Sequence, residues 1–375
     1  MMPSIPEDKN GKICPYFNKC GGCEFQNLSY EEQLNRKINL VKESLNISHL
    51  QVFPSKPFHY RNRMDFAFFK NGIGLREKGK WYKFVDIEYC LIAKEKINVL
   101  LKEVREFFKD IDSFDIRKHT GTFRYAVIRS VLTSNISIII NQESEKKEEA
   151  INLIKNFAFI TSAENLLVCE IPPNADVSIS ENYQVIKGID LLYTKIKEKE
   201  FYFHSQGFFQ INDNLIENLH QYVTQILEKY DTTNGELLDF YGGVGVFGII
   251  NSEKFKQIII IDNYPLSLNL VKRNCEINKI KNISFFLLED KNLKELSFKN
   301  PLFVIADPPR VGIHPKAIKY LNKQKPELII YISCNLNQLI KDLKEFTNYQ
   351  IKSVAFFDFF PQTRNIELVC ELVPI

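Results

Sequence analysis

The amino-acid sequence predicts an α/β protein of two domains, in which a doubly wound domain follows a β-rich α+β domain. The chain has 375 residues, which is too long for one typical domain. After about residue 236, short apolar runs alternate with helical segments, as in a parallel sheet with helices on both faces. Residues 58–203 show mainly the patterns of β-strands. We therefore expect one domain over residues 1–203 and another over residues 204–375.

The N-terminal half is expected to begin with a cysteine-rich knot at residues 14–23. Ser29 and Glu32 form a capping box before apolar residues at helical spacing, which predicts a helix over residues 29–46. This helix is a candidate to pack on the second domain. Further helices are expected over residues 94–110 and 148–157. The expected strands are MDFAFF, FRYAVIRSVL, ISIIIN and VIKGIDLLYTKI.

In the C-terminal half, apolar runs predict buried strands, and segments between them predict helices. The strands are ELLDFY, IIIID, ISFFLL, LFVIAD and LIIYIS, and the helices include SLNLVKRNCEIN and NQLIKDLKEF. Ligands of such sheets bind at the carboxyl ends of the strands. The residues at or near those ends are therefore candidate site residues: Asp239, Asp262, Asp290, Asp307 and Cys334.

The composition is that of a globular protein, with 45% hydrophobic and 25% charged residues. No apolar run of about 18 residues is present, so we expect no membrane span. The first residues, MMPSIPEDKNGK, contain no apolar signal core, which predicts a cytoplasmic protein. Eight cysteines in such a protein are not expected to form a disulfide framework. We expect a monomer.

A basic segment lies between Lys56 and Lys83, where eight Lys or Arg residues accompany only two acids. Aromatic residues are interleaved with them. Attraction to phosphates combined with base stacking needs this mixture, and Arg61 and Arg63 are the candidate contacts to nucleic acid. The alternative is a solvated strand face with core aromatics on its other side.

A glycine-rich turn, LDFYGGVGVFG at residues 238–248, follows a strand and opens a helix. Glycines let the backbone approach a ligand closely, and the helix start offers free N–H donors. Asp262 lies 19 residues after Gly243 and can accept both ribose hydroxyls of a nucleoside. Because Asp239 precedes the turn and the glycine pattern of a dinucleotide site is not clean, the segment favours S-adenosylmethionine over a nicotinamide cofactor.

The segment FVIADPPRVGIHP places Asp307 before two prolines, which make the loop rigid. Such a loop can hold a flat base against the cofactor. Methyltransferases of exocyclic amines use a similar loop, usually followed by an aromatic residue, whereas this chain has Arg310 there. The alternative is an ordinary turn at the end of a strand.

A cysteine, Cys334 in YISCN, is expected between a strand and a helix. A helix N-terminus lowers the pKa of a thiol and favours the thiolate. The alternative is a small buried hydrophobic residue.

An acid, Glu367 in FFPQTRNIELV, lies within an apolar segment. Burial there would be costly without a partner or a task, and it would raise the pKa toward the range of a general base. The alternative is an outward-facing residue of an edge strand.

The segment SQGFFQIN contains Phe208 and Gln210, which can stack on a base and form hydrogen bonds to it. The alternative is a hinge strand between the two halves.

The segment CPYFNKCGGC supplies three thiols, and a fourth cysteine follows in DIEYC: Cys14, Cys20, Cys23 and Cys90. Four thiolates suit a [4Fe–4S] cluster or structural zinc, and the spacing does not separate the two. The remaining cysteines Cys169, Cys275 and Cys370 are expected in the core.

In combination, C-x5-CGGC, FFQIN, DPPRVGI, SCN and the late FPQT…IE are highly specific. With them the chain resembles the RNA uridine carbon-5 methyltransferase family, especially its iron–sulfur branch of ribosomal RNA enzymes and archaeal transfer RNA enzymes. The resemblance runs from Cys14 to Val373. It implies a C-terminal Rossmann-like class I methyltransferase domain and an N-terminal iron–sulfur and RNA-binding domain.

The resemblance also implies roles for individual residues. Cys334 is similar to the family nucleophile, and Glu367 to the acid that removes the carbon-5 proton. Phe208 matches a residue that packs near the base. The cofactor-binding candidates are Gln210, Asp239, Tyr241, Gly243, Asp262, Asp290 and Asp307, of which Gln210 and Asp307 also match contacts to the base. The cysteines that match cluster ligands are Cys14, Cys20, Cys23 and Cys90, which favours [4Fe–4S] over zinc.

The resemblance therefore predicts formation of 5-methyluridine in RNA with S-adenosylmethionine. With only 13 residues before the cysteine knot, the chain is similar to the shorter members that act on 23S ribosomal RNA. Transfer RNA is the alternative substrate. From other classes, an amine methyltransferase would not need Cys334, and a non-catalytic iron–sulfur RNA-binding protein would not need Asp239, Asp262 and Glu367 together. Two departures from the family pattern are Leu336 after SCN and Asn365 two residues before Glu367.

Overall fold

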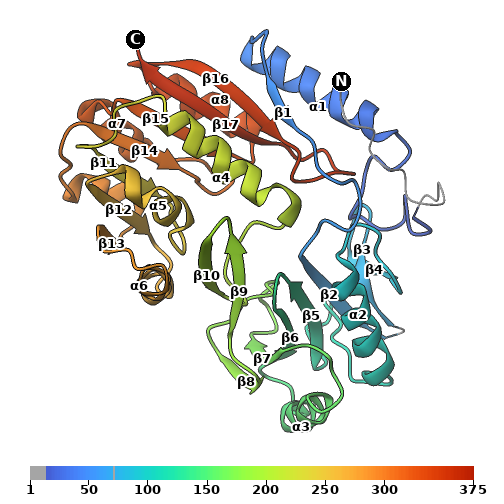
Figure 1. Ribbon diagram of the computed structural model, residues 1–375. Coiled ribbons are helices and arrows are strands. Elements are labelled where there is room, and N and C mark those ends of the chain that lie inside the picture. Colours follow the sequence, from blue (N-terminus) through green and yellow to red (C-terminus); the bar gives the residue numbers. More distant parts are fainter. Residues whose placement is uncertain (1–13, 71) are drawn as a thin grey trace. The chain divides into compact units, whose positions relative to one another are not determined.

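A computed structural model of the protein describes residues 14–70 and 72–375 (Figure 1). The chain forms two compact units that are interleaved in sequence. The first contains the segment up to Ser29, Lys56–Thr194 and His204–Asp213, and the second contains Tyr30–Ser55, Lys195–Phe203 and Asn214–Ile375. The sequence predicted two continuous domains that meet between residues 203 and 204, whereas each of these units is made of three separate segments. The difference arises because pairing between segments distant in sequence leaves no local sign.

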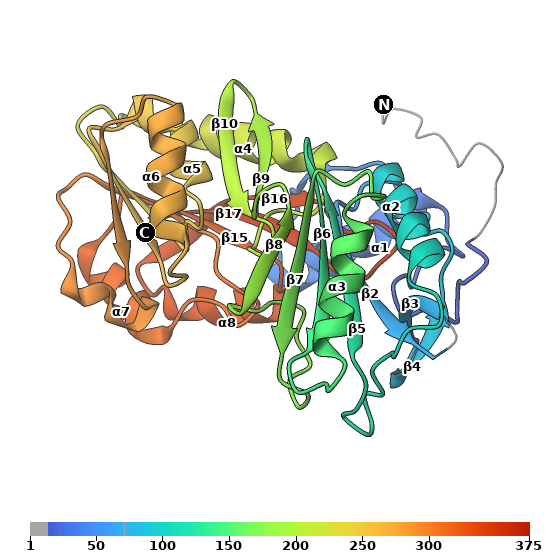
Figure 2. The same ribbon diagram turned by 90° about the horizontal axis from the view of Figure 1, so that it is seen from below.

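The first unit is built on a seven-stranded sheet in the order β4-β3-β2-β5-β6-β7-β8. Its strands are β2 (Arg63–Phe69), β3 (Gly72–Glu77), β4 (Lys80–Asp86), β5 (Phe123–Ser130), β6 (Ser134–Asn141), β7 (Asn165–Ile171) and β8 (Tyr183–Lys187). Neighbours are antiparallel except β6 and β7, which α3 (Lys147–Phe157) connects. This helix and α2 (Glu95–Phe107) cover one face and supply the main apolar core (Figure 2).

The β-rich pattern predicted for the N-terminal half is confirmed, with one difference. The segment VIKGIDLLYTKI is not one strand, because Gly188 takes a φ of +70° and ends β8. The chain resumes as β9 (Leu191–Ile196), which forms a separate two-stranded sheet with β10 (Lys199–His204).

The second unit is built on an eight-stranded sheet in the order β1-β16-β17-β15-β14-β11-β12-β13. Its strands are β1 (Gln51–Phe53), β11 (Glu236–Phe240), β12 (Gln257–Asp262), β13 (Ile283–Leu287), β14 (Leu302–Ala306), β15 (Leu328–Ser333), β16 (Tyr349–Phe357) and β17 (Glu367–Pro374). All neighbouring pairs are parallel except the two that contain β17. The predicted parallel sheet is therefore confirmed, with one reversed strand that the sequence pattern did not reveal.

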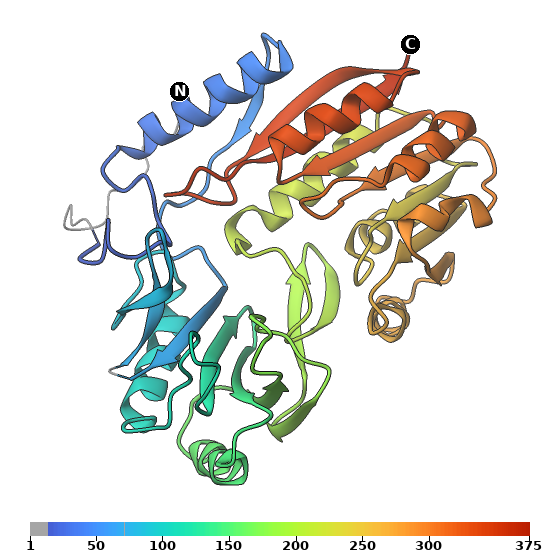
Figure 3. The same cartoon turned by 180° about the vertical axis from the view of Figure 1, so that it is seen from behind.

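Helices cover both faces of this sheet, as predicted. They are α1 (Tyr30–Leu45), α4 (Asp213–Leu227), α5 (Val246–Ile250), α6 (Ser267–Ile277), α7 (Pro315–Gln324) and α8 (Leu336–Glu345), with short 3-10 turns at Ser252–Lys254 and Asp290–Glu295. The helices α1, α7 and α8 lie on one side of the sheet (Figure 3), and their apolar residues join one core. On the other face, Tyr222 of α4 packs its ring 5.7 Å from that of Phe357. Within the described residues, no helix is both long and apolar enough to cross a membrane.

The strand order reverses at β11, because β12 lies on one side of it and β14 on the other. In open α/β sheets, ligands bind outside the carboxyl ends of the strands at the point where the strand order reverses. A ligand site is therefore expected on the segments that follow β11, β12, β14 and β15.

Candidate active site

The glycine turn after β11 is held by two carboxylates. The buried Asp239 accepts a hydrogen bond from the N–H of Gly248 at 2.8 Å. At the end of the neighbouring strand β12, Asp262 accepts one from the N–H of Gly243 at 2.9 Å. Burial, opposed by the Gly248 N–H and assisted by Asp262, raises the pKa of Asp239 to about 7. The two acids that the sequence analysis selected therefore shape the same turn.

The turn itself needs glycine at several positions. A Cβ atom on Gly242 would lie 2.6 Å from Cγ2 of Ile260, and Gly245 has a φ of +84° where α5 begins. A Cβ on Gly243 would meet nothing within 4 Å, although its φ is +53°. The backbone at Gly243 is therefore open on the side where a side chain would stand, which suits close approach of a ligand.

Tyr241 and Asp290 complete this end of the sheet. The hydroxyl of Tyr241 donates to a carboxylate oxygen of Asp290 at 2.7 Å. Asp290 lies just after β13, so the bond joins the loops that follow β11 and β13. The structure brings together Asp239, Tyr241, Gly243, Asp262 and Asp290.

A second group of predicted residues meets where β14, β15 and β17 lie side by side. Asp307 follows the last residue of β14, and Cys334 follows the last residue of β15. Because β17 runs antiparallel to β15, with Ser333 opposite Leu368, its first residue Glu367 lies at the carboxyl edge beside Cys334. Glu367 is 3% exposed and begins an interior strand. The alternative of an outward-facing edge residue is therefore wrong.

The pKa of the Cys334 thiol differs from the value expected at a helix N-terminus. Burial, together with Glu367 and Asp307, raises the pKa of Cys334 to about 11, while Arg310 acts in the opposite direction. The predicted lowering of the thiol pKa is thus wrong for the protein without substrate, because burial and two carboxylates outweigh the helix N-terminus. Burial and Asp307 also hold the pKa of Glu367 well above its usual range, and Arg310 again opposes them.

The loop that carries Asp307 and Arg310 is fixed by polar residues that the sequence analysis did not select. Asn335 accepts from the N–H of Gln338 as the N-cap of α8, and its amide donates to the carbonyl of Arg310 at 2.9 Å. Asp342 of α8 accepts from the Ile313 N–H at 2.9 Å and from the Tyr331 hydroxyl at 2.6 Å. Its only sign in the sequence was an acid spaced with Leu336 and Leu339 on the apolar face of α8.

The predicted base-contacting residues lie in the first unit, on the segment 205–212. The buried guanidinium of Arg129 donates to the carbonyls of Gly207 at 2.5 Å and Phe209 at 3.1 Å. The amide of Asn62 donates to the carbonyl of Gln210 at 2.9 Å. The ring of Phe208 is nevertheless 77% exposed. A fixed backbone therefore presents an uncovered aromatic ring.

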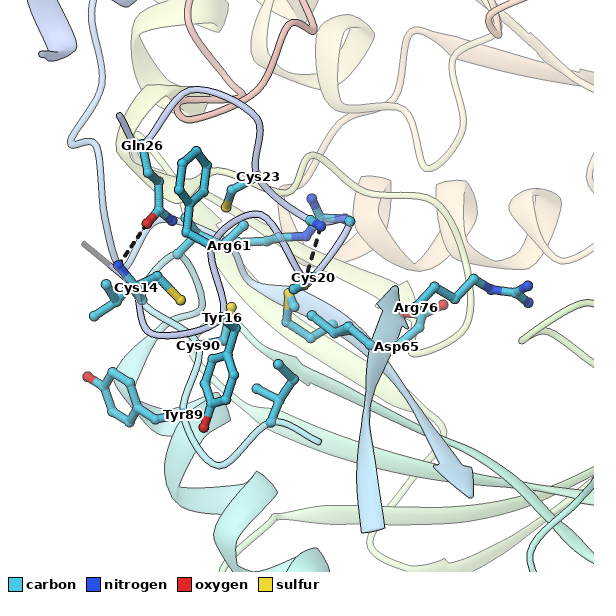
Figure 4. Close-up of a pocket in the computed structure, with 18 of the residues that line it drawn as sticks. Cys14, Tyr16, Cys20, Cys23, Gln26, Arg61, Asp65, Arg76, Tyr89 and Cys90 are labelled. Carbon is cyan, nitrogen blue, oxygen red and sulfur yellow. Dashed lines mark hydrogen bonds between the residues drawn. The ribbon is translucent and has the colours of Figure 1, made fainter. Parts of the chain in front are cut away.

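The four predicted ligand cysteines also lie in the first unit, where Cys14, Cys20, Cys23 and Cys90 line one cavity of roughly 440 Å³ (Figure 4). Burial and the neighbouring thiols raise the pKa of Cys23 to about 12. In the part of the chain that the structure describes, no group of three or more His, Cys, Asp or Glu side chains is arranged around a single metal-ion position.

Arg61 and Arg63, predicted to contact nucleic acid, line the same cavity. Arg63 pairs with Asp65 at 3.1 Å, and the Nε of Arg61 donates to the carbonyl of Arg63 at 3.0 Å. Both side chains therefore have structural partners, and their contact with RNA stays a prediction.

Comparison with known proteins agrees with this geometry. The family model described as tRNA (Uracil-5-)-methyltransferase matches residues 29–373. The tRNA (uracil(54)-C(5))-methyltransferase of Pyrococcus horikoshii is 33% identical over 369 residues, which cover 97% of this chain and 86% of that protein. The crystal structure of Pyrococcus abyssi tRNA (uracil-54, C5)-methyltransferase in complex with S-adenosyl-L-homocysteine has a TM-score of 0.80 and 30% identity, and covers 96% of this chain and 86% of that chain.

The doubly wound sheet, its glycine turn and this structural likeness define an RNA methyltransferase that uses S-adenosylmethionine. Within that class, the chain belongs to the RNA uridine carbon-5 methyltransferase family. The predicted family and enzyme class are thereby confirmed, and a non-catalytic function is not favoured. The monomeric state and the cytoplasmic location stay predictions.

The raised pKa of Cys334 can be measured by alkylation. A thiol with a pKa of about 11 is ionised to only about one part in a thousand at pH ~8, whereas an ordinary cysteine is ionised to about a quarter. Without RNA, Cys334 should therefore react slowly with iodoacetamide at that pH and faster as the pH rises. Arg310→Met should slow the reaction further, because it removes the cation that favours the thiolate. Peptide mass spectrometry identifies the modified cysteine, and reaction as fast as that of free cysteine would contradict the raised pKa.

Proposed function

We propose that this protein forms 5-methyluridine in RNA, with Cys334 as covalent nucleophile and Glu367 as general base. The observation that carries the proposal is the register of β17 against β15, which brings these two residues together at the carboxyl edge of the sheet. Methylation of uracil carbon 5 needs a nucleophile that activates the ring and a base that removes the carbon-5 proton, and a thiol and a carboxyl group can supply these two functions.

The thiolate of Cys334 adds to carbon 6 of uracil, and the electrons of the 5,6 double bond move toward a carbonyl oxygen. Carbon 5 thereby becomes nucleophilic and would take the electrophilic methyl group that S-adenosylmethionine supplies. The electrons of the broken methyl–sulfur bond would stay with the sulfur, and S-adenosylhomocysteine would leave. Carbon 5 then carries both the methyl group and its original proton. Glu367 accepts this proton, the double bond re-forms, and the sulfur of Cys334 leaves carbon 6 as the thiolate.

The charges at the site suit both the addition of the Cys334 thiolate and the removal of the carbon-5 proton by Glu367. Arg310 favours the ionised forms of both Cys334 and Glu367. A carboxylate whose pKa is raised by burial holds an abstracted proton more strongly than an ordinary glutamate does. The target base must leave its stack to reach a thiol that follows a buried strand, and the exposed ring of Phe208 would stack on it. In this proposal Gln210 and Asp307 contact the cofactor and the base.

The cofactor would bind at the turn after β11. The carboxylate oxygens of Asp262 already accept from Gly243 and Tyr264, at 2.9 and 2.8 Å. The hydroxyl of Ser267 also donates to the oxygen that Tyr264 contacts, at 3.3 Å. Because each carboxylate oxygen can accept two hydrogen bonds, the oxygen bonded to Gly243 can still accept one from a ribose hydroxyl. Asp239, Tyr241 and Asp290 would hold the turn in shape, and Gly243 would allow close approach of the cofactor.

The four cysteines fit a [4Fe–4S] cluster better than one zinc ion. A structural zinc ion needs its sulfur ligands about 2.3 Å away around one point, whereas these thiols surround a cavity (Figure 4). We infer that Cys14, Cys20, Cys23 and Cys90 hold the cluster, which would link the 14–23 segment to Cys90 after β4. With four thiolate ligands the cluster has no open position for a substrate, so its role would be structural.

Transfer RNA is the substrate that we propose. The relatives from two Pyrococcus species, 33% and 32% identical to this chain, are named for uracil 54 of transfer RNA. The prediction of 23S ribosomal RNA rested on the short segment before the cysteine knot, whereas these two relatives are named for transfer RNA.

Glu367→Gln should permit attack by Cys334 and methyl transfer but block the last step, because a neutral amide cannot take the proton. A covalent complex of protein and methylated RNA should therefore accumulate on a denaturing gel. Cys334→Ala should form no complex and no product, with cofactor binding retained. Normal turnover by Glu367→Gln without any complex would remove this residue from the mechanism.

The RNA substrate is identified by supplying unmodified transfer RNA and 23S ribosomal RNA separately with labelled S-adenosylmethionine. We expect label in transfer RNA and, after nuclease mapping, at one uridine. Label confined to ribosomal RNA would contradict the proposed substrate while leaving the reaction type intact.

Protein purified without oxygen should be brown and contain iron and acid-labile sulfide. Cys20→Ser should lose this colour and iron, because one of the four ligands is missing. Stoichiometric zinc without iron would show that the cluster assignment is wrong.

A further inference from the structure

The buried face of α1 carries two polar residues where an amphipathic helix normally buries apolar ones. Gln33 and Lys37 are 1% and 3% exposed. They share this face with Leu34 and Val41, which pack into the core of the second unit. A buried amide or ammonium group is costly unless it has a partner. The partners lie in residues 358–366, the segment that joins β16 to β17 and leads directly into Glu367.

Lys37 forms a buried ion pair with this segment. Its Nζ lies 2.7 Å from a carboxylate oxygen of Asp358 and donates to the carbonyl of Phe360 at 3.0 Å. The hydroxyl of Tyr30, two helical turns earlier, donates to the other carboxylate oxygen of Asp358 at 2.8 Å. The side chain of Asp358 is fully covered, so two donors from α1 determine where it can lie.

Gln33 forms a reciprocal pair with Gln362. Its amide nitrogen donates to the side-chain oxygen of Gln362 at 3.0 Å, and its oxygen accepts from the Gln362 backbone N–H at 2.9 Å. Gln362 has a φ of +67°, a left-handed conformation that few non-glycine residues adopt. The two bonds therefore stabilise a backbone conformation that is otherwise unfavourable.

The remainder of the same segment reaches the catalytic group. Thr363 donates from its hydroxyl to the carbonyl of Phe360 and accepts from the N–H of Asn365, at 2.9 and 3.2 Å. The side-chain oxygen of Asn365 accepts from the guanidinium of Arg310 at 3.2 Å. A series of hydrogen bonds therefore runs from α1 to the arginine that acts on both Cys334 and Glu367.

Stability alone does not account for this arrangement. A buried ion pair adds little stability over well-packed apolar residues of similar volume, whereas the two donors of α1 restrict where the Asp358 carboxylate can lie. The ends of the 358–366 segment are held by the pairing of β16 with β17. Its middle depends on α1, which precedes it by more than 300 residues.

We propose that α1 positions the general base, in that Lys37 and Gln33 fix the 358–366 segment and so keep Glu367 and Asn365 in place beside Cys334 and Arg310. Lys37 and Gln33 are positioning residues, since neither is argued to touch the substrate. The inference rests on the proposed function and concerns its final step, removal of the carbon-5 proton.

The test measures elimination separately from binding and folding. Gln33→Leu and Lys37→Met are compared with the wild-type protein in single turnovers on the RNA that the wild-type protein methylates. We expect turnover to fall about 10- to 100-fold, because a misplacement of about 1 Å caused by a mutation far from the reacting atoms can cost about 100-fold. The covalent complex of protein and methylated RNA should accumulate on a denaturing gel, and the affinity for S-adenosylhomocysteine should stay that of the wild-type protein.

Matched variants separate positioning from stability. Tyr230→Phe removes a 2.7 Å hydrogen bond to the buried Glu371, which lies on the same strand as Glu367 but away from the segment. Like the wild-type protein, Tyr230→Phe should accumulate no detectable covalent complex with RNA. Lys37→Met combined with Asp358→Leu removes both buried charges and should recover stability, yet still accumulate the complex.

Two results would overturn the inference while Glu367→Gln still traps RNA. One is normal turnover in Gln33→Leu and the Lys37/Asp358 double variant. The other is a loss of turnover that follows melting temperature and cofactor affinity, with no complex formed. Failure of Glu367→Gln itself to trap RNA would instead count against the proposed function.

Discussion

The reversed direction of β17 is the constraint on which the candidate active site depends. A parallel strand in that position would start at the opposite edge of the sheet and take Glu367 away from Cys334. The reversal brings a buried acid to the ends of β14 and β15, where Asp307 and Cys334 already lie. Because like charges crowd there, the protein without substrate disfavours the ionised forms of both Cys334 and Glu367, and Arg310 opposes this.

The parts of this arrangement that local patterns determine could be predicted from the sequence. The apolar runs gave the strands of the second unit, and the ends of those runs gave Asp239, Asp262, Asp307 and Cys334. The direction of β17 could not be predicted, because an apolar run carries no information about which neighbour it pairs with. The pKa of Cys334 was predicted in the wrong direction, since helix position is visible in a sequence but burial beside two distant carboxylates is not.

In the first unit, the partners of the arginine side chains could not be predicted from the sequence either. Its basic segment suggested contacts to RNA, yet Arg63 pairs with Asp65 two residues away, and Arg61 lies beside the cysteine cavity. The arginine that most clearly serves the 205–212 segment is Arg129, which looked like an ordinary strand residue. The sequence therefore shows where basic residues are abundant. It does not show which backbone carbonyls accept their hydrogen bonds, because those carbonyls are positioned by long-range packing.

The place of α1 and β1 in the second unit has a consequence for how this chain can be divided. Read along the chain, most of the first unit is an insertion between β1 and α4 of the methyltransferase sheet. A fragment beginning at residue 204 would lack the strand that covers β16 and the lysine that neutralises Asp358, leaving an open sheet edge and a lone buried charge. A fragment of this chain that keeps the catalytic unit intact must therefore include α1 and β1 as well as the C-terminal part.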